Sequence, residues 1–145
     1  MIQYKGEEIG RFSVEIELAN YDDLARARAG VISETQVRRV TLRGVVDTGP
    51  TRLVIPQAVA DRLGVRTSGR TSVRYADGRV AQRQLATDLF LTFGDRSSLF
   101  SAVVEPDRDS ALIGAIVLEE LDLIADCTRQ SLAPRDPKQI VSEAE

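Results

Sequence analysis

The sequence predicts a single, mainly β domain whose sheet closes, or partly closes, into a barrel. Seven or eight short segments have the apolar and β-branched composition of strands, whereas two short segments have helical features. A length of 145 residues supports one hydrophobic core and is too short for two independent ones. We therefore treat 1–145 as one domain, with a folded core at about 9–133 and a loose tail at 134–145.

The first third of the chain predicts two strands separated by a short connection. Apolar and polar side chains alternate from residue 10 to 18, which is the pattern of a half-buried strand. Residues 20–30 contain turn and cap residues and predict a loop or one short helical turn. The segment 36–46 is rich in β-branched and apolar residues, so we expect a strand that runs into the core.

A short buried strand at 53–55 and a short helix come next. Pro56 precedes the helical segment 57–63 and Gly64 follows it. Proline at the start and glycine just past the end are typical of a helix, because proline fixes a helical φ and glycine accepts the reversed one.

The middle of the chain predicts a meander of strands. Two strand-like arms between 71 and 85 flank Asp77-Gly78, and Asp-Gly is among the strongest short signals of a β-hairpin. Further strands are expected at 88–93 and 99–104, joined by a turn. Consecutive strands with such short connections pair as neighbours in a sheet.

The last part of the chain changes from strand to helix at a glycine. The segment 111–114 (Ala-Leu-Ile-Gly) predicts a compact apolar strand. Apolar residues then recur at near-helical spacing up to Leu121, with Glu119 and Glu120 on the outer face. A last strand-like arm is expected around 130–133.

Composition limits the chemistry that is open to this protein. The chain has no histidine and one cysteine, so catalysis by Ser-His-Asp or Cys-His, and zinc sites built on imidazoles or several thiolates, are excluded. The net charge is -3, and Arg38-Arg39 is the only adjacent basic pair, so nucleic acid is not an expected partner. No apolar stretch approaches the roughly 20 residues of a membrane-spanning helix. With no secretory signal pattern, we expect a cytoplasmic location.

The triplet Asp47-Thr48-Gly49 is the candidate for catalytic chemistry. It follows an apolar strand and precedes another, so Asp47 is expected in a turn between two core elements. A buried carboxylate is costly without compensation, and therefore needs a physical reason. By itself, the triplet is equally compatible with a structural turn that an aspartate initiates.

A second segment favours the catalytic interpretation. Gly114 of the Ala-Leu-Ile-Gly segment lies 114 − 47 = 67 residues after Asp47, with a hairpin between them and a helix after it. This order resembles the retropepsin-like family of aspartic proteases (clan AA, the retroviral type). In that family a flap hairpin, two apolar residues with a glycine, and a helix follow the Asp-Thr-Gly turn. The resemblance spans Phe12 to Asp136, and 111–137 is similar to bacterial single-domain members.

The resemblance implies an acid protease fold: a closed β-barrel with one or two short helices that forms one half of a dimeric enzyme. It implies that Asp47 is the catalytic carboxylate, Thr48 locks the two turns across the dimer axis, and Gly49 donates its N–H to the carboxylate. Two carboxylates held close together share one proton, so one acts as base and the other as acid. One triplet per chain makes the partner a second copy of this chain, a homodimer. No metal and no cofactor are required.

The resemblance also assigns a flap to the predicted hairpin. Tyr75, Ala76, Asp77 and Gly78 would cover an extended peptide substrate, exclude water and pair with its backbone. The alternative is an ordinary surface hairpin with Tyr75 packed on the sheet. In either case Asp77 is expected to form the turn rather than to act as an acid.

The sequence departs from the family pattern next to the triplet. Pro50 stands where this family usually has alanine or serine, and proline offers neither an N–H nor a hydroxyl to the carboxylate. Arg52 is a nearby cation that would favour the charged form of Asp47 if it pointed toward it. Asp126 and Cys127 are interpreted as structural.

The leading hypothesis is an aspartic endopeptidase that hydrolyses peptide bonds with water activated by an Asp47 pair. The alternative is a catalytically weak or inactive retropepsin-like module that binds peptides or dimerises, with Asp47 kept for structure. A third possibility is a β-barrel interaction module in which the triplet is accidental. This last hypothesis leaves the order of triplet, hairpin and Leu-Ile-Gly unexplained.

Overall fold

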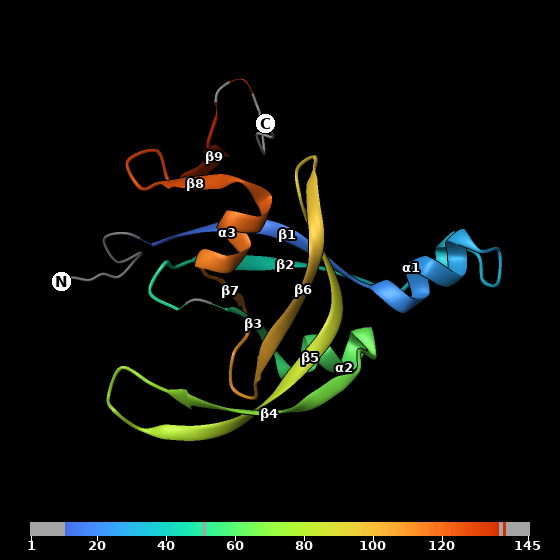
Figure 1. Cartoon of the computed structure of the whole chain (residues 1–145), viewed down its shortest axis with the longest axis horizontal. Coiled ribbons are helices and arrows are strands. Elements are labelled where there is room, and N and C mark those ends of the chain that lie inside the picture. The colour runs from blue at the N-terminus through green and yellow to red at the C-terminus, as the bar shows by residue number, and fades with distance from the viewer. Residues whose placement is uncertain (1–10, 51, 137, 139–145) are drawn as a thin grey trace, which may run out of the picture.

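The structure consists mainly of β-strands joined by short turns and helices (Figure 1). The computed structural model describes residues 11–50, 52–136 and 138. The strands are β1 (Phe12–Asn20), β2 (Arg39–Val46), β3 (Leu53–Pro56), β4 (Thr67–Arg74), β5 (Val80–Phe93), β6 (Arg96–Glu105), β7 (Ala111–Ile113), β8 (Leu123–Asp126) and β9 (Ser131–Pro134). The helices are α1 (Tyr21–Arg28), α2 (Gln57–Leu63) and α3 (Ala115–Leu121), with a 3-10 turn η1 (Glu34–Gln36).

The main sheet closes on itself, which confirms the predicted barrel. Its seven strands stand in the order β1-β2-β7-β3-β6-β5-β4, and a further pairing between β1 and β5 closes six of them into a ring. Strand β4 therefore lies outside the ring and forms a hairpin with β5 (Figure 1). Strands β8 and β9 form a separate two-stranded hairpin.

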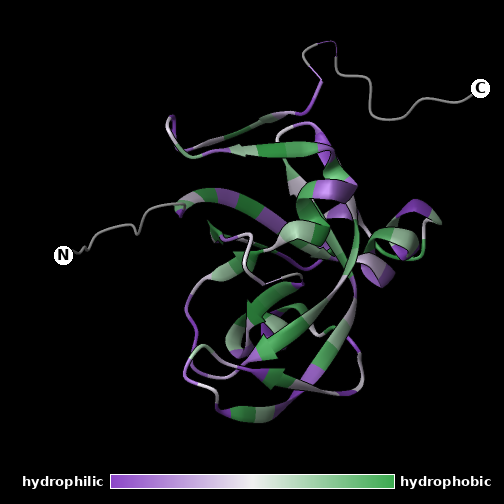
Figure 2. Cartoon of the chain, turned by 60° about the vertical axis from the view of Figure 1, so that its left-hand side comes forward, coloured by the Kyte–Doolittle hydropathy of each residue, from purple (hydrophilic) through white to green (hydrophobic). Residues whose placement is uncertain are grey.

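The alternation along β1 explains how the barrel acquires its core. Phe12, Ile16 and Leu18 are buried, whereas Glu15 is exposed. The two-coloured bands along this strand in Figure 2 show the same alternation. Leu18 lies opposite Leu91 of β5, in the strand pairing that closes the barrel, and both side chains belong to the hydrophobic core. Each such buried side chain stabilises the fold by about 1.5–3 kcal/mol.

Helix α1 is longer than the single turn predicted for this region. It has eight residues, and the side chain of Asn20 caps it by accepting a hydrogen bond from the N–H of Asp23 at 3.0 Å. The Asn20 amide also donates to the carbonyl oxygen of Leu63 at 2.8 Å, which connects α1 to the end of α2. A contact between residues 43 positions apart is not visible in local sequence, and it stabilises the extra turn.

Strand β5 joins two segments that the sequence predicted as separate strands. It runs through 14 residues, with an irregularity in its pairing with β6 between Ala86 and Leu89. Asp88 has a φ of 59°, which lets the strand bend without ending. The first part of β5 pairs with β4 and the last part pairs with β1, so one bent strand connects the hairpin to the barrel.

Helix α3 has the buried and exposed faces that the sequence predicted. Val117, Leu118 and Leu121 of α3 are buried, whereas Glu119 and Glu120 are exposed. Beyond this helix the β8–β9 hairpin continues to Pro134, and Arg135 donates to the Asp122 carboxylate at 2.6 Å. Most of the tail predicted from 134 onward, namely 137 and 139–145, lies outside the described residues. Among the residues that are described, no helix is long and apolar enough to cross a membrane.

Candidate active site

The turn that contains Asp47 is held in place by β7. Strands β2 and β7 run in parallel with Val46 opposite Ile113, and the N–H of Asp47 donates to the Ile113 carbonyl at 3.1 Å. On the other side of the turn, Val54 of β3 pairs with Leu112. The Ala-Leu-Ile-Gly segment therefore lies between the two strands that flank the triplet, as the order of the motifs suggested.

Within the turn, the backbone holds one oxygen of the Asp47 carboxylate. The N–H of Gly49 donates to Asp47 Oδ1 at 3.0 Å. A Cβ atom at position 49 would lie 3.2 Å from this same oxygen, so a residue without a side chain leaves room for the carboxylate. Asp47 is largely buried, with 14% of its side chain exposed, whereas Thr48 is exposed in the single subunit.

Arginine 11 holds the second oxygen of the carboxylate. Arg11 Nη2 lies 2.7 Å from Asp47 Oδ2, and 42% of the Arg11 side chain is exposed. Arg52, the cation that lies near the triplet in the sequence, is exposed and lines a different hollow beside Val54. Sequence reasoning missed Arg11 because its contact depends on the pairing of β1 with β2, which a local pattern does not reveal.

A cavity of about 650 Å³ connects the turn to the tip of the β4–β5 hairpin. It brings together Asp47 and Gly49 of the triplet with Tyr75 and Ala76 of the predicted flap, and Pro50 also lines it. Thr48, Asp77 and Gly78 are not among its lining residues. The remaining wall is formed by Arg11, Val54, Val73, Arg74, Arg79, Arg83, Glu105, Asp107, Arg108 and Leu112.

The hairpin tip is a tight, exposed turn. The N–H of Gly78 donates to the Tyr75 carbonyl at 2.9 Å, and the N–H of Tyr75 donates to the Arg79 carbonyl at 2.8 Å. Asp77 Oδ1 accepts the N–H of Arg79 at 2.9 Å, so Asp77 shapes the turn. Gly78 has a φ of 87°, a conformation that glycine adopts readily. Residues 76–79 are exposed, so the tip buries little surface.

Tyr75 fastens the hairpin to the wall of the cavity. Its hydroxyl donates to Glu105 Oε2 at 2.6 Å, and Arg83 Nε donates to Glu105 Oε1 at 2.9 Å. The Arg79 guanidinium lies 4.4 Å from the centre of the Tyr75 ring. Burial, followed by the hydrogen bond to Glu105, raises the pKa of Tyr75, so the phenol remains a proton donor. Sequence reasoning missed Glu105 because it named only the tip of the hairpin.

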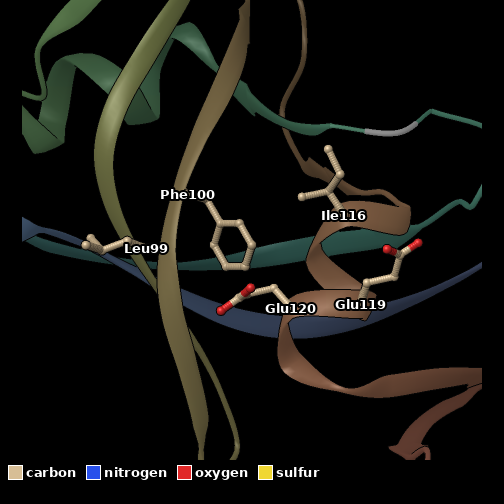
Figure 3. A pocket seen from close by; sticks show the side chains of 5 residues that line it. All are labelled: Leu99, Phe100, Ile116, Glu119 and Glu120. Atoms are coloured by element: carbon tan, nitrogen blue, oxygen red, sulfur yellow. The ribbon is translucent and has the colours of Figure 1, made fainter. Parts of the chain in front are cut away.

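A second hollow, of about 310 Å³, contains two carboxylates but lacks the geometry of a catalytic pair. Leu99, Phe100, Ile116, Glu119 and Glu120 of β6 and α3 line it. Figure 3 shows that the Glu119 and Glu120 carboxylates point in different directions. Ser98 Oγ donates to Glu120 at 2.9 Å on this exposed surface. Among the described residues, no group of three or more potential ligands could hold a metal ion.

Comparison with known proteins identifies the class of protein that this fold and site define. Residues 33–120 match the family described as "gag-polyprotein putative aspartyl protease". This match covers more than half of the 145 residues, so the chain belongs to this family of retroviral-type aspartyl proteases.

Solved structures give the same fold. Among 244 matching chains is EIAV protease complexed with the inhibitor HBY-793. It shares 16% sequence identity with this chain and superposes with a TM-score of 0.56, over 83% of this chain and 94% of that chain. At this identity the likeness concerns the retropepsin fold. No curated protein sequence matches the chain significantly.

Proposed function

We propose that the protein is a homodimeric aspartic endopeptidase, in which one Asp47 carboxylate from each subunit activates water to hydrolyse a peptide bond. One observation carries this proposal: Asp47 is anchored by its N–H to Ile113, held at Oδ1 by Gly49, and placed on the wall of the cavity beneath the hairpin tip. A turn in the core with a fixed, partly accessible carboxylate is what acid–base catalysis requires.

The chemistry follows from two carboxylates at short distance. Both cannot ionise easily, so the pair holds one proton between them. The charged carboxylate removes a proton from the attacking water, while the protonated partner donates to the carbonyl oxygen of the substrate. The sequence contains one Asp-Thr-Gly triplet, so the second carboxylate comes from a twofold-related copy. Thr48, exposed in one subunit, is available to contact the partner's turn.

An extended peptide fits the space between the turn and the hairpin. The cavity has the volume of a typical ligand site and contains both apolar and polar groups. Strand β4 has one neighbour in the main sheet, β5, and stands at its edge. An edge strand offers unpaired N–H and C=O groups that bind an extended chain. We propose that residues 75–79 act as a flap over such a peptide.

A second candidate function is a peptide-binding dimer without hydrolysis. The ion pair between Arg11 and Asp47 favours it, because a bound cation competes with a second carboxylate for the same oxygen. Pro50 also favours it, because the residue after the triplet cannot donate a backbone N–H.

Digestion of a diverse peptide mixture separates the two candidates. The purified protein is incubated from acid to neutral pH, with and without an aspartic-protease inhibitor, beside Asp47→Asn. We expect inhibitor-sensitive cleavage that Asp47→Asn abolishes while dimerisation is retained. Peptides that bind but are not cut would support the binding module instead.

A further inference from the structure

The cavity around Asp47 is positively charged in an otherwise acidic protein. Among the described residues that line it, five are arginines and three are acids, whereas the whole chain carries a net charge of -3. The arginines are Arg11, Arg74, Arg79, Arg83 and Arg108, and the acids are Asp47, Glu105 and Asp107.

Two of these arginines are neutralised by acids of the same wall. Arg11 pairs with Asp47, and Arg83 pairs with Glu105 at 2.9 Å. Arg79 forms a long salt bridge with Asp77, at 4.0 Å, and both side chains are mostly exposed. Within the part of the chain that the structure describes, no salt bridge involves Arg74 or Arg108.

Arg108 is fixed at the wall rather than free in solvent. Its Nε donates to the Ser110 carbonyl at 2.9 Å and its Nη2 donates to Ser110 Oγ at 3.0 Å, and Ser110 is itself buried. Burial is the main cause that lowers the pKa of Arg108; the charges of Asp109 and Glu105 oppose this shift, and those of Arg11 and Arg43 add to it. A guanidinium nevertheless keeps its charge in a protein. Arg108 is therefore a partly desolvated cation that a carboxylate would stabilise.

We propose that this cleft selects peptide segments that carry Asp or Glu side chains close to the scissile bond. Arg108 binds one such carboxylate on the Asp47 side of the cavity, and Arg74 and Arg79 attract others beneath the hairpin tip. The proposal deepens the proposed function of the same site and rests on it.

The apolar lining residues favour a peptide with both acidic and apolar side chains over a simple anion. Val54, Val73 and Leu112 contribute apolar surface beside the arginines. An extended peptide that carries both acidic and apolar side chains matches such a lining. Its backbone can in addition pair with β4.

Three peptides that differ at one position test the preference directly. The best-cleaved sequence from a peptide mixture is synthesised with Glu, Gln or Lys at the acidic position closest to the cut. Cleavage is measured near neutral pH, where Glu is ionised. We expect kcat/KM for the Glu peptide to exceed that for the Gln peptide by about fivefold, and the Lys peptide to be poorest. The difference should shrink as salt is added, because salt screens charges.

Variants assign the preference to particular arginines. Arg108→Gln and Arg74→Gln should each reduce the ratio of Glu to Gln cleavage, and Arg108→Lys should retain part of it. Arg70→Gln is the matched control, because Arg70 lies on the same strand as Arg74 but does not line this cavity, and it should leave the ratio unchanged.

The outcomes separate this inference from the proposed function. Equal cleavage of the three peptides, or a preference for Lys, overturns the inference and leaves the peptidase intact. If no peptide is cut, the proposed hydrolysis fails, and fluorescence anisotropy of the same labelled peptides decides the charge preference by binding alone. Tighter binding of the Glu peptide, weakened by Arg108→Gln, then supports the acidic selectivity, and equal binding overturns it.

Discussion

Arg11 faces Asp47 because of the antiparallel register of β1 and β2. Phe12 lies opposite Val46, so the residue before Phe12 comes next to the residue after Val46. The resulting contact of 2.7 Å between Arg11 Nη2 and Asp47 Oδ2 is thus a consequence of the sheet. If the dimer forms as we propose, this cation competes with the carboxylate of the second subunit for Asp47.

Replacement of Arg11 tests this competition. We expect Arg11→Gln to increase cleavage of an uncharged peptide about fivefold, because an ion pair with a partly exposed arginine contributes on the order of 1 kcal/mol. The measurement is kcat/KM, with dimerisation followed by sedimentation. Arg43→Gln is the control, because Arg43 contacts Ser13 and not Asp47. Lower activity of Arg11→Gln would show that the arginine supports the carboxylate in the working enzyme.

Gly49→Ala should damage catalysis more than folding. The added Cβ would lie 3.2 Å from Asp47 Oδ1, so the carboxylate must move by a few tenths of an ångström. Small displacements of a reacting group are costly, and we expect at least about a tenfold loss of kcat. Thermal unfolding and dimer mass should change little. A variant with normal kcat would show that this oxygen is not held for chemistry.

Tyr75→Phe should loosen the hairpin tip. The variant loses the hydrogen bond of 2.6 Å to Glu105, while Arg83 continues to hold Glu105. A hydrogen bond to a charged group contributes about 1.5–3 kcal/mol, so hydrogen exchange of residues 75–79 should become at least about tenfold faster. Tyr21→Phe, on α1, is the control. In the native protein, a bound peptide-like inhibitor should protect the same amides, and without such protection the hairpin is not a flap.

Asp23 should make stability depend on pH below about 4. Hydrogen bonds from Arg38 lower the pKa of Asp23 below its usual 3.8, and 4% of this residue is exposed. Because the folded pKa is lower than the unfolded one, the stabilisation is complete above the unfolded pKa and is lost as pH falls through the folded pKa.

Urea unfolding checks this prediction. Asp23→Asn should lower the free energy of unfolding by about 2 kcal/mol at neutral pH and should flatten the acid part of the pH profile. Asp22→Asn, which removes a more exposed partner of Arg66, should change it by less than about 0.5 kcal/mol. Equal effects of the two substitutions would contradict the role of burial.

The sequence predicted the elements whose pattern is local. Pro56 and Gly64 marked the helix α2 at its observed bounds, with Gly64 in the left-handed conformation at a φ of 61°. Asp77-Gly78 likewise indicated the hairpin, because its tight turn, like the end of helix α2, needs a particular backbone conformation. The extra turn of α1 and the continuity of β5 depend on tertiary pairing, and local propensity did not reveal them.

The contacts of the candidate site were likewise predictable only where they join residues that are close in sequence. The contact between Gly49 and Asp47 was predictable, because it joins two nearly adjacent residues of one turn. Arg11, Glu105 and Arg108 were missed, because each reaches the cavity through strand register or a loop between strands. If the register of β1 with β2 had been inferred from the alternating patterns of the two strands, it would have placed Arg11 beside Asp47.

Mixing of subunits tests the shared Asp47 pair most directly. Wild-type protein and Asp47→Asn are combined in equal amounts, allowed to exchange subunits, and assayed at constant total concentration. If one carboxylate from each subunit is essential, random pairing leaves about one quarter of the dimers active, and the activity falls to about one quarter of the wild-type value. Activity of about one half, the value for subunits that work independently, would contradict a catalytic pair formed across the dimer axis.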